Sequence, residues 1–68
     1  MQQERFSLNV PTRAVDTRDK GFIVVPQGAV LSVQETNDGG RLLKVLWGER
    51  ELLILSQDLA ERGNRLPT

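Results

Sequence analysis

The chain contains neither cysteine nor histidine, and it has no tyrosine. Without cysteine no disulfide can hold the fold together, and the usual ligand sets for zinc, haem and iron–sulfur clusters are absent as well. We therefore expect no metal site and no cofactor. A small hydrophobic core must stabilise the 68 residues, either alone or together with a partner subunit.

An excess of charge of one sign is also lacking. Nine basic and nine acidic residues give a formal net charge of zero. This balance argues against a protein that neutralises many phosphates, which requires a surplus of Lys and Arg. No apolar run reaches the roughly 18 residues of a membrane span, and residues 1–5 are polar. We expect no signal peptide, no transmembrane segment and no membrane partner, with the cytoplasm as the default location.

The first half of the chain indicates two strands. Residues 6–10 alternate apolar and polar side chains, as a strand with one buried face does, and Pro11 ends this pattern. We expect residues 12–15 to continue as an extended segment and residues 16–21 to form a charged loop. The β-branched and aromatic run at residues 22–25 is too short for a stable helix, so it predicts the next strand.

The second half predicts a three-stranded meander over residues 29–55. Its clearest signal is Asn-Asp-Gly-Gly at residues 37–40, because these residues accept the positive φ angles of hairpin turns. Strands at residues 29–35, 41–47 and 50–55 flank this turn and the Gly-Glu turn that follows. We expect the first of them to face inward with its alternate apolar residues, namely Ala29, Leu31 and Val33.

These elements predict an all-β domain, a small five-stranded antiparallel barrel, since closing a sheet removes its edges. Residues 56–59 suit one 3₁₀ turn, which Ser56 caps through its hydroxyl, placed before a last strand or a C-terminal tail. The expected layout is a disordered N-terminus at residues 1–5, a barrel at residues 6–60 and a flexible tail at residues 61–68.

The order of parts resembles an SH3-like barrel over residues 13–59. Ala-Val-Asp at residues 14–16 lies where the SH3 family has its opening motif, and residues 28–33 resemble the strand after its diverging turn. The helical turn falls where that family has one. The chain also resembles small uncharacterised bacterial proteins with the pattern GAVL-V, VLW-GRE and DL-ERG. Asp58 stands where the family has a tyrosine of its peptide shelf, which argues against binding of proline-rich peptides.

Trp47 is the only tryptophan. Strand alternation places it on the face of Leu43 and Val45, opposite Lys44. We therefore expect Trp47 to plug the core or its rim, because aromatic side chains dominate small cores. The alternative is an exposed residue for stacking or protein contact.

The apolar residues of the meander outnumber the places in one small interior. Leu42 and Leu46 share the face of Lys44, and residues 52–55 are apolar on both faces of their strand. Either the N-terminal residues 6–10 cover the surplus, or it forms an interface with a second copy or another protein. The candidate interface residues are Leu42, Leu46, Leu52 and Ile54.

These observations predict a non-enzymatic SH3-like module that acts through protein–protein contact or self-association. The alternative is a small barrel that binds nucleic acid, a less favoured partner given the charge balance and the scarcity of aromatic residues. Its contacts would be Arg13, Arg41, Lys44, Arg50 and Trp47. Glu49 and Glu51 flank a turn, where solvated carboxylates are typical, and no motif implies catalytic residues or a small-molecule substrate.

Overall fold

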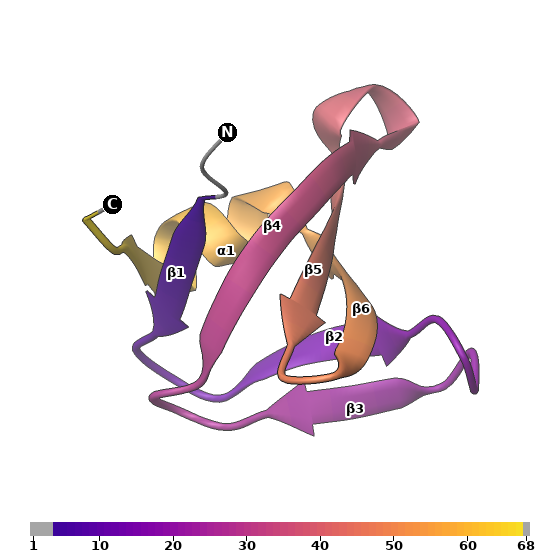
Figure 1. Ribbon diagram of the computed structural model, residues 1–68, viewed down its shortest axis with the longest axis horizontal. Coiled ribbons are helices and arrows are strands. Elements are labelled where there is room, and N and C mark those ends of the chain that lie inside the picture. The colour runs from indigo at the N-terminus through magenta and orange to yellow at the C-terminus, as the bar shows by residue number, and fades with distance from the viewer. Residues whose placement is uncertain (1–3, 68) are drawn as a thin grey trace.

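The computed structural model describes residues 4–67, except for the side chains of residues 37 and 38. Strands take up 56% of these residues and helices 15%, so the fold is mostly β. In chain order the elements are β1 (Arg5–Leu8), β2 (Thr12–Asp16), β3 (Phe22–Val25), β4 (Val30–Asn37), the 3₁₀ turn η1 (Asp38–Gly40), β5 (Leu42–Trp47), β6 (Arg50–Leu55), α1 (Ser56–Arg62) and β7 (Gly63–Arg65) (Figure 1).

In the described part of the chain, one antiparallel sheet holds all seven strands in the order β3-β2-β6-β5-β4-β1-β7. The sheet curls into a half-barrel, in which β2 and β3 run across the lower ends of β4 and β5 while α1 lies behind β1 and β4 (Figure 1). β3 and β7 form the two edges of the sheet. Because β3 lies at an edge, no further strand of the described residues covers its outer side, and its outward-facing apolar side chains are exposed to solvent.

The predicted meander is confirmed. β4 pairs with β5, and β5 pairs with β6 over its whole length. The turn between β4 and β5 contains Gly39 and Gly40 with φ angles of 66° and 91°. Glycine reaches this left-handed region without steric cost, which is why Gly-Gly supports a hairpin here.

The core lies on the concave side of the half-barrel. Every second residue of the central strands points into it, as expected for the two-residue period of a strand. Leu59 of α1 covers the open side with 1% of its surface exposed. The buried apolar residues are Leu8, Ala14, Val25, Leu31, Val45, Leu52, Ile54 and Leu59. Burying each large side chain contributes about 1.5–3 kcal/mol, so few of them can be spared in so short a chain.

The prediction of five strands is wrong, because residues 4–67 already form seven. The extended segment expected after Pro11 is a separate strand, β2, since β1 pairs with β4 whereas β2 pairs with β6 and β3. The other additional strand is β7, which pairs with β1. Its sequence Gly-Asn-Arg has no apolar alternation, so only the pairing of its backbone reveals it as a strand.

The helix after β6 also differs from the prediction. It is a seven-residue α-helix rather than one 3₁₀ turn. Ser56 does not cap it: Leu55 is the N-cap residue and provides no side-chain hydrogen bond. The hydroxyl and the backbone N–H of Ser56 instead donate to the carbonyl oxygen of Arg41, at 3.2 and 2.8 Å. Ser56 therefore ties the start of α1 to the start of β5.

The barrel also extends beyond the predicted boundaries. Arg5 already belongs to β1, and the predicted tail contains the end of α1 and all of β7. The backbone N–H of Asn9 donates to Arg62, and that of Leu66 donates to Arg5, at 2.7 and 2.8 Å. These bonds hold residues 62–66 against the first strand. Residues 1–3 of the predicted disordered N-terminus, and residue 68 of the predicted tail, lie outside the described residues.

Candidate protein interface

The convex side of the half-barrel carries large apolar side chains in addition to polar ones. On β6, Leu53 and Leu55 point outward because they alternate with two buried residues of the same strand. Leu55 is 51% exposed, and it lies directly opposite Leu42 of β5. Leu42 also faces outward, on the same face of β5 as Lys44 and Leu46.

Among the described residues, the edge strand β3 carries the two large hydrophobic side chains with the highest exposed fractions. Phe22 is 79% exposed and Val24 is 61% exposed. Both point away from the core, while Ile23 and Val25 of the same strand pack into it or against it. Edge strands can pair with other chains, and contiguous exposed apolar side chains mark interaction sites, so this strand is a candidate contact surface.

The strand register joins these side chains into one surface. Phe22 lies opposite Val15 of β2, and Val15 lies opposite Leu53 of β6. This row runs without interruption across three strands on the convex side. Adding the neighbouring outward-facing residues defines what we term the outer apolar face, made up of Phe22, Val24, Val15, Leu53, Leu55 and Leu42.

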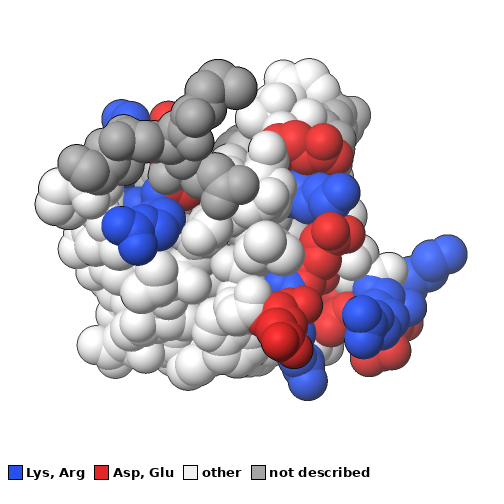
Figure 2. All heavy atoms as spheres, in the orientation of Figure 1, with Lys and Arg blue, Asp and Glu red and all other residues white. Residues whose placement is uncertain are grey.

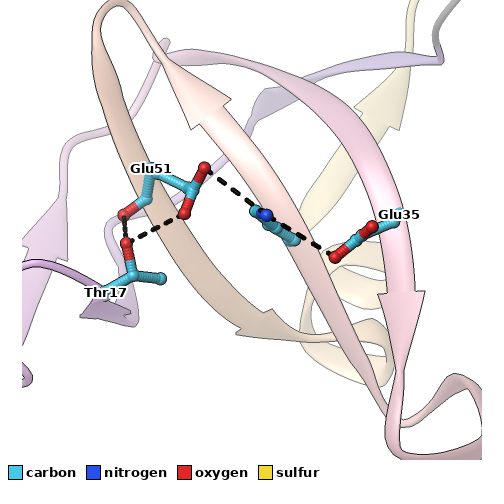
Figure 3. A network of polar contacts seen from close by, with 4 residues as sticks. Thr17, Glu35 and Glu51 are labelled. Carbon is cyan, nitrogen blue, oxygen red and sulfur yellow. Dashed lines mark hydrogen bonds and ion pairs between the residues drawn. The ribbon is translucent and has the colours of Figure 1, made fainter.

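The same row ends in charges. Leu53 lies opposite Lys44 on β5, and Lys44 lies opposite Glu35 on β4, where a register shift after Val33 brings the glutamate into place. The Nζ atom of Lys44 is 3.5 Å from Oε1 of Glu35 and 3.6 Å from Oε2 of Glu51 (Figure 3). The charge of Lys44 is therefore balanced by two carboxylates.

Thr17 extends this network towards β2. Its hydroxyl contacts both the backbone carbonyl and the carboxylate of Glu51, at 3.1 and 3.2 Å (Figure 3). In Figure 2 most of the acidic and basic side chains lie on the right of the view, basic groups also lie at the upper left, and the lower left carries none. The compensated charges of Glu35, Lys44 and Glu51 thus border the outer apolar face at Leu53. The exposed Arg13 borders it at Val24.

A depression of about 450 Å³ lies between the β2–β3 loop and the β5–β6 turn. Its most buried polar group is Asp16, with 6% of its surface exposed. One carboxylate oxygen of Asp16 accepts the backbone N–H groups of Arg18 and Asp19, and the other lies 3.7 Å from Nη1 of Arg50. Asp16 thus holds its own loop through one oxygen, a structural role that Asp commonly has in turns, and forms an ion pair with β6 through the other.

Among the side chains that the structure describes, no buried polar atom lacks a hydrogen-bond partner. Nor do three of the described carboxylates come close enough together to hold a metal ion. The described helices are all too short or too polar to cross a bilayer.

Two of the four predicted interface residues are placed differently from the prediction. Leu52 and Ile54 are buried, with 0% and 1% of their surface exposed, and belong to the core. The two-residue turn between β5 and β6 sets Trp47 opposite Arg50, so the side of β6 that faces the core carries Leu52 and Ile54. Leu42 and Leu46 lie on the convex side as predicted.

Of the two alternatives for the surplus apolar residues, covering by the N-terminal segment does not occur in the described structure. Leu8 is buried in the core, and Phe6 packs against it from the concave side. Val10 is 43% exposed and lies beyond the end of β1. The N-terminal strand therefore contributes to the core and leaves the outer apolar face open.

Trp47 is half-buried and packs against the core, as the plug interpretation predicted. It faces the concave side, whereas Lys44 faces the convex side. Arg13 is exposed on β2, and Arg41 is exposed just before β5. The predicted nucleic-acid contacts are thus divided between the two sides of the sheet, and two of them, Lys44 and Arg50, contact carboxylates.

Sequence reasoning missed five of the six residues of the outer apolar face. For Leu53 and Leu55 the signal was present, because the short turn after Trp47 fixes which residues of the next strand face inward. For Phe22 and Val24 there was none, since residues 22–25 are uniformly apolar and their exposure depends on the edge position of β3. No family model, curated protein or solved structure matches this chain.

Proposed function

We propose that this chain is a non-enzymatic SH3-like module that acts through protein–protein contact, with the outer apolar face as its contact surface. The observation that carries the proposal is the exposure of Phe22 and Val24, at 79% and 61%, beside the half-buried Val15 and Leu53. The antiparallel half-barrel with a helical segment before its last strand is compatible with the SH3-like layout.

The energetics support a contact role. Removing apolar surface from water gains roughly 25 cal/mol per Å², and a buried phenylalanine or leucine gains about 1.5–3 kcal/mol. In the isolated chain the side chains of Phe22, Val24 and Leu55 leave most of this gain unrealised. A partner that covers them recovers it. Aromatic anchors of this kind often supply a large share of the binding energy of an interface.

The composition disfavours the peptide-docking route of the SH3 family. That route uses a shelf of tyrosine and tryptophan, but the chain has no tyrosine. Its tryptophan packs against the core. Asp58 stands where the SH3 family, which the order of elements resembles, has its shelf tyrosine. The proposed contact surface is therefore on the opposite, convex side, and it includes the edge strand.

A co-purification experiment tests the proposal. The tagged chain is mixed with extract of the source cells and with a differently tagged second copy. The double variant Phe22→Ser/Val24→Ser is compared with the unchanged chain and with Val10→Ser, which removes an exposed valine away from this face. We expect a protein that the unchanged chain and Val10→Ser retain and that the double variant loses. Equal retention by all three proteins would contradict the proposal.

A further inference from the structure

Within residues 4–67, the backbone of β3 has groups that pair with no other strand and point away from the sheet. In the ladder between β2 and β3, the N–H of Asp16 donates to the carbonyl of Gly21 at 2.9 Å. Residues of an antiparallel strand bond alternately to one side and to the other, so Ile23 and Val25 bond to β2. The N–H and C=O groups of Phe22 and Val24 therefore face outward, at one end of the strand order.

This edge has little protection against pairing. Natural sheets guard their edges with charges, prolines, bulges or very short strands. No charged residue occurs within β3, and Pro26 follows the strand rather than interrupting it. The opposite edge, β7, is shorter and carries Arg65, which forms an ion pair with Glu4 at 3.4 Å. Of the two edges, β3 is the one suited to accept another strand.

We propose that β3 pairs antiparallel with β3 of a second copy of this chain, about a two-fold axis that passes beside Ile23. This inference rests on the proposed contact function and names the partner. In this register Phe22 of each copy lies opposite Val24 of the other, and the outward N–H and C=O groups of both residues are all hydrogen-bonded. No other antiparallel register of two β3 strands pairs both residues with each other.

The pairing is complementary in side chains as well as in backbone. It places the two exposed residues of each copy side by side on the convex surface, so that the outer apolar faces of the copies become continuous. In that register Lys20 lies across from Pro26 of the second copy, so no like charges are opposed. A formal net charge of zero adds no long-range repulsion between copies. An unrelated extended segment could match the backbone but not this side-chain symmetry.

The absence of natural cysteine allows a clean test by disulfide formation. In the proposed register, the Cα atoms of Ile23 in the two copies form a non-hydrogen-bonded pair, at about 4.5 Å. This distance is within the range that a disulfide spans. The Cα atoms of Val24 in the two copies lie roughly 8–9 Å apart, from the rise along a strand and the spacing between strands, which is too far.

We expect Ile23→Cys to form a covalent dimer under mild oxidation, and Val24→Cys to form little. A mixture of Phe22→Cys and Val24→Cys forms the mixed disulfide, because these positions are opposed in the pair. Chance collision predicts the reverse order for the single variants, since Val24 is 61% exposed and Ile23 is partly buried. Val24→Cys reacting as fast as Ile23→Cys, or faster, overturns the proposed register.

A second measurement keeps the test decisive if Ile23→Cys does not fold. Sedimentation equilibrium of the unchanged chain, up to ~1 mM because so small an interface predicts weak association, is compared with that of Val24→Pro. Proline removes the outward N–H of Val24, which bonds to nothing in β2, and prolines are tolerated on edge strands. Association that Val24→Pro weakens at least roughly tenfold supports the dimer. A strict monomer, or association unchanged by Val24→Pro, overturns it.

These outcomes can be told apart from failure of the proposed function. If the chain is a monomer but Phe22→Ser/Val24→Ser still loses a co-purified protein, the contact function holds and the second copy is not the partner. If that protein pairs with β3 through an extended segment of its own, Val24→Pro weakens its binding as well, and the dimer proposal is again overturned.

Discussion

Val15 on β2 lies directly opposite Leu53 on β6, and both side chains face away from the core. Their neighbours in sequence, Asp16 and Leu52, form the next pair and are buried. A single step along two paired strands thus separates the inside of the half-barrel from its outer apolar face. The consequences for stability and for contact can be tested separately on each side.

Leu52 and Leu55 belong to the same strand but should respond differently to truncation. Leu52 is fully buried, so Leu52→Ala leaves a cavity and should lower the free energy of unfolding by about 2–5 kcal/mol. Leu55 is 51% exposed, so Leu55→Ala should cost about 1 kcal/mol or less. Urea unfolding followed by circular dichroism measures both changes. Equal costs would show that the assignment of inner and outer faces on β6 is wrong.

Gly63 should be intolerant of a side chain. A Cβ atom at this position would lie 2.8 Å from the carbonyl oxygen of Leu59 and 3.4 Å from that of Ser7, where α1 passes into β7. Gly63→Ala should therefore destabilise the fold by about 1–3 kcal/mol, as forced overpacking does. Gly21→Ala is the matched control, since a Cβ atom there meets nothing within 4 Å. Thermal melts of the two variants provide the comparison.

This close approach also explains a limit of the sequence. Gly63 could be read only as a flexible residue in a polar segment, because the contact that requires glycine involves the backbone of α1 and of β1. By contrast, the hairpin at Gly39 and Gly40 was predictable, since the required φ angles are a local property of the turn. The turn could therefore be predicted from the residues within it, whereas the pairing of β7 with β1 could not be predicted from the sequence.

For the candidate interface, too, some residues could be assigned from the sequence and others could not. Leu42 and Leu46 could be assigned to the convex side because Lys44 between them marks a face that water reaches. Phe22 and Val24 could not, because an apolar run of four residues looks alike in a central strand and in an edge strand. Whether residues 22–25 form a central or an edge strand depends on how β2 pairs with β3 and β6. This pairing is determined by contacts between distant residues.

Binding of nucleic acid should be weak even where charge attraction is strongest. Lys44 contacts two carboxylates and Arg50 lies near a third, so these cations have little positive potential to offer phosphates. In a fluorescence polarisation titration at ~20 mM salt, labelled single-stranded and double-stranded oligonucleotides should show no saturable binding below about 100 μM protein. Saturable binding that Lys44→Gln abolishes would instead support the nucleic-acid alternative.

Backbone amide exchange along β3 tests the central claim most directly, because it reports on the exposed edge residue by residue. In dilute solution the amides of Phe22 and Val24 should exchange quickly, while those of Ile23 and Val25, bonded to β2, are protected. As the protein concentration rises to ~1 mM, exchange at Phe22 and Val24 should slow as the weak contact forms. The outward amide of Arg65 on β7, at the other edge, should stay unchanged. Exchange at Phe22 and Val24 that is independent of concentration, with no slowing by any co-purified protein, would contradict the account.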